Sequence, residues 1–235
     1  MKHHIIDLIF PKRCPICGDI MEAGARLACP ICKLKAPYVT TPYCLKCGKP
    51  IADAHMEYCT GCMENEPLFT QGRALFRYTD QIKKSIYSYK YGNRREYAAY
   101  YTEEIIRLLG DDIRRWRADA IIPIPIHKER AKKRGFNQAE LIAGMLGRNM
   151  QIPVCSDYVI REKNTIAQKN LNREERQNNL KRAFKITQND VKLEEVILLD
   201  DIYTTGSTIN AVTQVLLSAG VKRIYFVVLS IGNGL

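Results

Sequence analysis

Eight cysteines form four C-x-x-C pairs between residues 14 and 62, and they limit the fold of this region more than any other feature. The pairs begin every fifteen residues, at Cys14/Cys17, Cys29/Cys32, Cys44/Cys47 and Cys59/Cys62. A C-x-x-C turn brings two thiolates to one tetrahedral zinc ion, so two turns close one four-thiolate site. The array therefore predicts two structural zinc ions without an open coordination position.

Glycine follows only the first and third pairs, as Gly18 and Gly48, so the repeating unit is thirty residues long. We therefore assign Cys14, Cys17, Cys29 and Cys32 to one zinc ribbon and Cys44, Cys47, Cys59 and Cys62 to the next. A nested pairing is the alternative. A disulfide framework or an iron–sulfur site fits the repeat less well. We interpret Cys155 as a small apolar residue and His55 as a surface residue.

The chain of 235 residues has room for an ordinary domain and a small one, and its 46% hydrophobic content supports a packed core. Because the composition changes after Cys62, we place the boundary near residue 68, between a zinc module (1–68) and a second domain (69–235). The apolar patch in residues 1–10 is too short for a signal peptide or a membrane span. We therefore expect a cytoplasmic protein, and its net charge of +11 favours a phosphate-rich partner.

Residues 196–208 read as a strand, a loop and the start of a helix. Four apolar residues precede Asp200 and Asp201, and hydroxyl residues then surround Gly206. A helix N-terminus with nearby hydroxyl groups suits a phosphate, and the paired carboxylates suit a ribose diol or a magnesium ion. Plain turn and helix-cap chemistry fits the same residues about as well. From the residues alone, a sugar-phosphate site and an ordinary turn both stay open.

A second buried strand is predicted over residues 118–126, and a strongly basic loop follows it before a helix over 137–150. Mutual repulsion in this loop favours a bound pyrophosphate or nucleic-acid backbone over a solvated run of charges. The basic side chains are His127, Lys128, Arg130, Lys132, Lys133 and Arg134.

Residues 81–91 are predicted to form a helix ended by Gly92, with Tyr87, Tyr89 and Tyr91 interleaved with lysines. Such interleaving suits single-stranded nucleic acid, although tyrosines at this spacing more often belong to a core. A further helix is expected over 96–109, capped by Gly110, and a basic lid or exposed connector over 161–182. Lid or DNA contacts are assigned to Lys90, Arg94, Lys163, Arg173 and Arg176.

Residues 196–208 closely resemble the phosphoribosyl pyrophosphate (PRPP) loop of the type I phosphoribosyltransferases. Together with the cysteine array, residues 90–93, Arg134-Gly135-Phe136-Asn137-Gln138 and the motifs over 163–179, the whole chain resembles the ComF family. The resemblance implies an α/β fold: a mostly parallel sheet flanked by helices, of type I phosphoribosyltransferase type, preceded by a small double zinc ribbon.

The resemblance also implies roles for individual residues. Asp200 and Asp201 would contact the ribose hydroxyls of PRPP, and the loop of Thr204, Thr205, Gly206, Ser207 and Thr208 would hold its 5-phosphate. The segment 127–134 would lie near the pyrophosphate, with magnesium bridging.

Two hypotheses of function follow from the resemblance and the basic charge. In the first, the protein is a competence-associated factor that binds PRPP and single-stranded DNA, while its ribbons dock a ComFA-like helicase or a recombination mediator. In the second, it is an active phosphoribosyltransferase with an unidentified acceptor in nucleotide or carbohydrate-related metabolism. A purely structural zinc adaptor ranks third, because the PRPP loop is intact.

Overall fold

A parallel sheet of four strands forms the centre of the computed structural model, which describes residues 11–21, 26–162, 183–187 and 192–232. The strands are β1 (Gln71–Arg77), β2 (Ala120–Pro123), β5 (Glu195–Tyr203) and β6 (Arg223–Ile231). Their order is β1-β6-β5-β2, and every neighbouring pair is parallel. The predicted parallel sheet is therefore confirmed.

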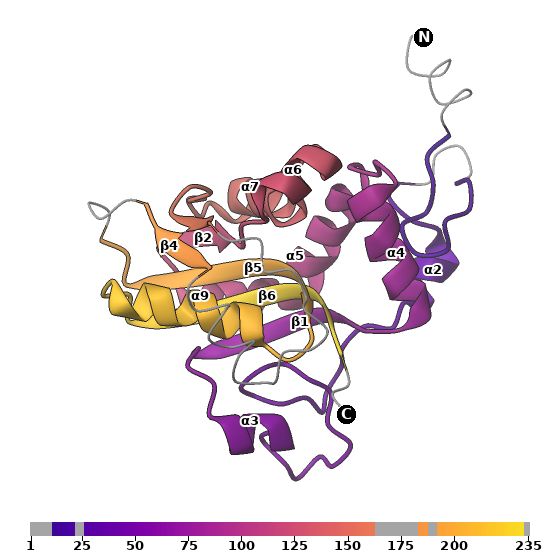
Figure 1. The fold of residues 1–235 in the computed structure, drawn as a ribbon. Coiled ribbons are helices and arrows are strands. Elements are labelled where there is room, and N and C mark those ends of the chain that lie inside the picture. Colours follow the sequence, from indigo (N-terminus) through magenta and orange to yellow (C-terminus); the bar gives the residue numbers. More distant parts are fainter. Residues whose placement is uncertain (1–10, 22–25, 163–182, 188–191, 233–235) are drawn as a thin grey trace, which may run out of the picture.

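Helices cover both faces of this sheet (Figure 1). Successive strand residues point to opposite faces, so Ile197 and Leu199 pack into one buried cluster while Val196 and Leu198 pack into the other. The first cluster includes residues of α4 (Asp80–Tyr91), α5 (Tyr97–Trp116) and α7 (Gln138–Met150). The second includes the apolar face of α9 (Ser207–Ser218).

Several predicted boundaries are wrong. The strand expected over 118–126 is shorter, and α5 runs past Gly110, because Ile113 and Trp116 continue its buried face. The basic loop expected over 127–134 is helix α6 (Lys128–Arg134), which His127 caps and which Gly135 ends at φ +75°. A small antiparallel sheet of β3 (Val159–Arg161) and β4 (Phe184–Ile186) was not predicted.

The two ribbons lie against opposite sides of the sheet. Cys14 and Ile16 of the first ribbon, which continues into α2 (Pro30–Lys35), join the buried cluster of α4 and α5. The four cysteines of the second ribbon, which contains α3 (Thr60–Asn65), join the cluster of Phe69 and Phe226. Neither ribbon therefore relies on a core of its own. The domain boundary near residue 68 stays a prediction.

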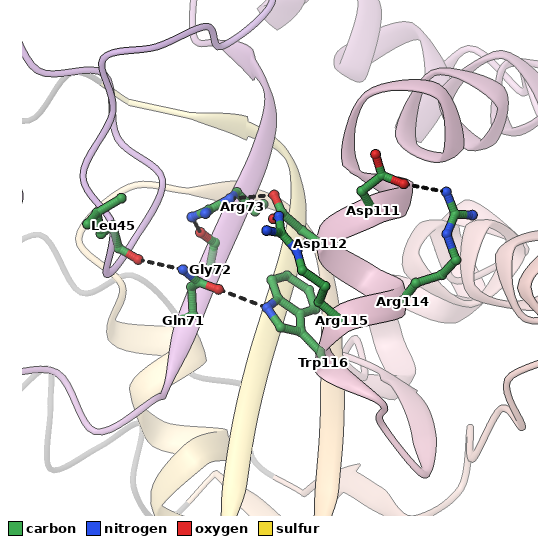
Figure 2. A network of polar contacts seen from close by, with 9 residues as sticks. All are labelled: Leu45, Gln71, Gly72, Arg73, Asp111, Asp112, Arg114, Arg115 and Trp116. Atoms are coloured by element: carbon green, nitrogen blue, oxygen red, sulfur yellow. Dashed lines mark hydrogen bonds and ion pairs between the residues drawn. The ribbon is translucent and has the colours of Figure 1, made fainter.

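A polar network fastens the second ribbon to β1 and α5 (Figure 2). Gln71 donates to the Leu45 carbonyl at 3.0 Å and accepts from the Trp116 indole at 2.8 Å. Arg73 Nε lies 2.7 Å from Asp112 Oδ2, and both side chains are almost fully buried. At Gly72, any Cβ would collide with the Phe226 ring of β6, so the ring can cover β1 only because residue 72 is glycine.

The first ribbon is fastened to α5 through a buried carboxylate, Glu104. Tyr38 donates to Glu104 Oε2 at 2.6 Å, Lys33 Nζ lies 3.1 Å from Oε1, and Arg107 also bonds the carboxylate. Burial by itself would raise the pKa of Glu104, but the hydrogen bonds from Arg107, Tyr38 and Lys33 hold it below its usual value.

Across the described residues, no helix has the length and apolar character needed to cross a membrane.

Candidate functional site

The acidic pair lies where β5 extends beyond its neighbour β2. The β2–β5 pairing ends at Pro123 and Leu199, so Asp200 and Asp201 stand at the carboxyl end of the sheet, where open parallel sheets bind ligands. The Asp201 N–H donates to Asp200 Oδ1 at 2.8 Å. Burial and the adjacent Asp201 charge raise the pKa of Asp200 to about 7, against the opposing effects of that N–H, Lys90 and Arg161.

Two cations from distant parts of the chain face this pair. Lys90, near the end of α4, places its Nζ 2.6 Å from Asp201 Oδ2, with side chains 15% and 18% exposed. Burial lowers the pKa of Arg161 on β3, with a further lowering from the charge of Arg130 and a raising from Asp200. The acidic pair therefore interacts with positive charge from α4, through Lys90, and from β3, through Arg161.

The hydroxyl loop turns directly from the acidic pair into α9. Thr204 and Thr205 are exposed, and Thr205 Oγ1 lies 2.7 Å from Ser207 Oγ. Gly206 adopts φ +74°, and a Cβ there would lie 2.7 Å from Tyr203 Cζ, so both backbone and space require glycine. The first amides of α9 and the loop hydroxyls are the hydrogen-bond donors of this segment that could hold a phosphate group.

Helix α6 is the basic segment that follows the carboxyl end of β2. Lys128, Arg130, Lys132 and Lys133 are exposed, while His127 Nδ1 accepts a hydrogen bond from the Glu129 N–H at 3.3 Å. Asn137 donates to the Ile124 carbonyl at 3.1 Å and caps α7, which ties the segment to the end of β2. These contacts hold the basic helix next to the carboxyl end of β2.

Arg134 differs from the rest of the basic segment. It donates to Gln138 Oε1 at 2.9 Å and to the Tyr91 hydroxyl at 2.6 Å, so it joins α6 to the end of α4. Its predicted role at a pyrophosphate stays a prediction. Arg94 forms an ion pair with Glu96 at 3.5 Å, and the predicted contacts Lys163, Arg173 and Arg176 lie outside the described residues.

The direct contact of Lys90 with Asp201 was not predicted from the sequence, and Arg161 was not singled out within its basic run. No local sequence pattern indicates the contact of Lys90 with Asp201, because the two residues are separated by 111 positions in the chain. A lysine next to tyrosines gives no indication of which carboxylate it will meet.

Eight of the nine cysteines form two groups of four, and the members are those that the thirty-residue repeat predicted. Within each group the sulfur atoms all lie within 4.8 Å of one another. The Sγ–Sγ distance is 3.9 Å for Cys17–Cys29 and 3.7 Å for Cys47–Cys59. A tetrahedral zinc with Zn–S bonds of about 2.3 Å has S–S edges of about 3.8 Å, so both groups fit structural zinc.

Comparison with known families agrees with this architecture. Residues 5–63 match the double zinc ribbon domain, and residues 141–233 match the phosphoribosyl transferase domain. Fold, cysteine groups and family matches together define the class: a phosphoribosyltransferase-fold protein with an N-terminal double zinc ribbon.

Full-length relatives narrow the class further. The chain is 30% identical to Competence protein F of Haemophilus influenzae, over 92% of this chain and 95% of that protein. It is 28% identical to DNA utilization protein YhgH of Escherichia coli K12, over 92% and 96% of the two chains. It is also 28% identical to Competence protein ComFC of Bacillus subtilis, over 82% and 78%. The chain belongs to the ComF family of competence proteins.

Proposed function

We propose that this protein handles DNA during natural transformation and that its phosphoribosyltransferase-like domain binds PRPP with magnesium as well as single-stranded DNA. Two of its relatives carry competence in their names and a third is named for DNA utilization. The observation that carries the PRPP assignment is the juxtaposition of the acidic pair at the end of β5 with the hydroxyl loop that opens α9.

The residues suggest how such a ligand is held. Ionised Asp200 and Asp201 accept hydrogen bonds from the ribose diol, and the loop from Thr204 to Thr208 donates to the 5-phosphate. Magnesium prefers carboxylate and phosphate oxygens, so it would be held by the pyrophosphate group of PRPP and the acidic pair, where it neutralises phosphate charge. Lys90 and Arg161 balance the acidic pair while the exposed lysines of α6 lie toward the pyrophosphate.

Calorimetry with PRPP and Mg²⁺ tests this assignment. The Asp200→Asn variant loses an acceptor whose hydrogen bonds to a charged group are each worth about 1.5–3 kcal/mol, and Asp200→Asn with Asp201→Asn loses several. We expect PRPP affinity to fall at least about 100-fold in the double variant. Asp111→Asn, which changes an exposed carboxylate that pairs with Arg114, serves as the control. Unchanged affinity in the double variant contradicts the ribose assignment.

The second candidate function is phosphoribosyl transfer itself, which the intact acidic pair and phosphate loop favour. In that reaction pyrophosphate leaves the anomeric carbon, and the protein mainly positions two substrates and neutralises charge. Pyrophosphate release from PRPP separates the two candidates when it is measured with no acceptor, with single-stranded DNA and with a panel of nucleobases. Release that depends on an acceptor identifies a transferase, while PRPP binding without release supports the binding function.

The docking function of the ribbons is part of the same proposal. Their four-thiolate groups leave no coordination position for a substrate, so a structural or docking role fits them best. A competence helicase similar to ComFA, or a recombination mediator, is the partner that we propose. Pull-down with the purified helicase tests it, and equal capture by a variant with charge reversals on the exposed ribbon surface counts against it.

A further inference from the structure

The three tyrosines of α4 point in different directions. Tyr89 is fully buried, donates to the Gln138 carbonyl at 2.9 Å and packs against Tyr101 and Phe136. Tyr87 and Tyr91 are 65% and 49% exposed, and their ring centroids lie 4.9 Å apart at a tilt of 44°. The helix therefore uses one tyrosine for the core and leaves two adjacent rings on its surface.

Arg134 extends this exposed pair into a row of three planar groups. Its guanidinium carbon lies 4.7 Å from the centroid of the Tyr91 ring, and Nη2 donates to the Tyr91 hydroxyl. Nη1 donates to Gln138, which is itself buried. Because α4 and α6 both anchor the row, the planar groups are positioned before any ligand arrives. We name this row, made of Tyr87, Tyr91 and Arg134, the aromatic platform.

Positive charge borders the platform on two sides. Lys83 and Lys84 are exposed one turn earlier on α4, and neither has a salt-bridge partner within the part of the chain that the structure describes. With Tyr87 they line a groove of about 780 Å³ between α4 and the first zinc-ribbon turn, where Asp80 is the only carboxylate among the lining residues. On the other side, exposed Lys132 and Lys133 directly precede Arg134 on α6.

We propose that the aromatic platform stacks the bases of single-stranded nucleic acid, whose phosphates lie along Lys83 and Lys84 on one side and α6 on the other. The proposal rests on the function proposed above and assigns it a surface. Exposed planar groups flanked by cations match a strand whose bases are unstacked, since a duplex hides its base faces. Lys90, on the same turn of α4 as Tyr91, contacts Asp201, so the strand would pass close to the proposed PRPP site.

Fluorescence anisotropy of the zinc-loaded full chain with a labelled oligothymidine, over a series of salt concentrations, tests the platform. Stacking of bases on the rings contributes to affinity without releasing counterions. Tyr87→Ala with Tyr91→Ala should therefore raise Kd at least about tenfold and leave the dependence of log Kd on log salt concentration, the salt slope, unchanged. The double Phe variant should keep most of the affinity. Lys83→Gln with Lys84→Gln should instead reduce the salt slope by about two.

Controls separate the platform from the function on which it rests. Tyr58→Ala removes a tyrosine of similar exposure, 42%, from the second ribbon and should bind like the wild type. Because Tyr91 supports Arg134, Tyr87→Ala alone is the variant least able to disturb the fold, and it should also weaken binding.

The outcomes are distinguishable. If the wild type binds the strand and the Tyr87→Ala and double Ala variants bind equally well, the platform is refuted while the DNA-binding function stands. Equal affinity for a duplex of the same length also refutes it. If the wild type binds no single strand, the DNA-binding function fails, and the platform fails with it.

Discussion

Replacing Lys90 with methionine tests how the acidic pair is held in the folded chain. Methionine keeps an unbranched apolar stem but removes the charge that lies 2.6 Å from Asp201 Oδ2. At an effective dielectric constant of about 20, the gross attraction at this distance is about 6 kcal/mol, and desolvation and side-chain ordering offset much of it.

The net loss of stability expected for Lys90→Met follows from how deeply the ion pair of Lys90 and Asp201 is buried. Loss of one partner from a buried pair costs about 3–5 kcal/mol, and an exposed pair contributes less than about 1 kcal/mol. With side chains 15% and 18% exposed, Lys90 and Asp201 are close to the buried case. We expect Lys90→Met to lower the free energy of unfolding by about 2–3 kcal/mol at pH 8, or Tm by about 4–12 °C for a chain of this size.

The loss should depend on pH because Asp200 titrates near neutrality. Its folded-state pKa, about 7, is above its ordinary value, so the folded chain holds a proton that the unfolded chain has released. Stability therefore falls as pH rises from about 4 to about 7, and Asp200 is charged above that window. Lys90 lowers the pKa of Asp200, so the Lys90→Met substitution should raise this pKa further. The stability of the variant then continues to fall at pH values where that of the wild type has levelled off. The difference in unfolding free energy between the two proteins should therefore be smaller at pH 5.5 than at pH 8.

Denaturant unfolding at both pH values provides the measurement, and Lys222→Met provides the control. Lys222 pairs with Glu194 at 2.8 Å, but both side chains are more than 60% exposed, so this variant should lose less than about 1 kcal/mol. A double-mutant cycle of Lys90→Met with Asp201→Asn should show coupling. If Lys90→Met behaves like Lys222→Met at both pH values, the reasoning is refuted.

Three further predictions concern other parts of the chain. Gly206→Ala should lower stability by about 1–3 kcal/mol and weaken PRPP binding; Gly220→Ala shares a positive φ but has open space, and equal losses would exclude the steric contribution. Glu104→Gln should lower Tm measurably more than Glu103→Gln, since only Glu104 is fully buried among cations and a tyrosine hydroxyl; a matching pair of Tm values would count against the first ribbon's anchor. Metal analysis should find about two zinc ions per chain and about one after Cys47→Ser, and one or none in the wild type contradicts the double ribbon.

The sequence by itself determined the features that depend on residues close together in the chain. The C-x-x-C turns and their thirty-residue repeat predicted both cysteine groups, because the turn that brings two sulfurs together is local. The strand, loop and helix around Asp200 and Asp201 were likewise visible, since apolar runs, adjacent acids and a glycine with hydroxyl neighbours are contiguous. The ends of helices and strands were predicted less well from the sequence. Helix α5 does not end at Gly110, because the packing of Trp116 on Tyr225 stabilises the helix beyond that residue.

Only the tertiary structure decided which distant groups meet. Lys90 reaches Asp201 and Arg134 reaches Tyr91 because the parallel strand arrangement brings α4, α6 and the end of β5 to the carboxyl end of the sheet, and no local spacing encodes that approach. The same packing buries Tyr89 and leaves Tyr87 exposed, since the phase of a helix relative to the core is set by what it packs against. The placement of the two ribbons on opposite sides of the sheet has the same origin, because their apolar cysteine clusters complete two different cores.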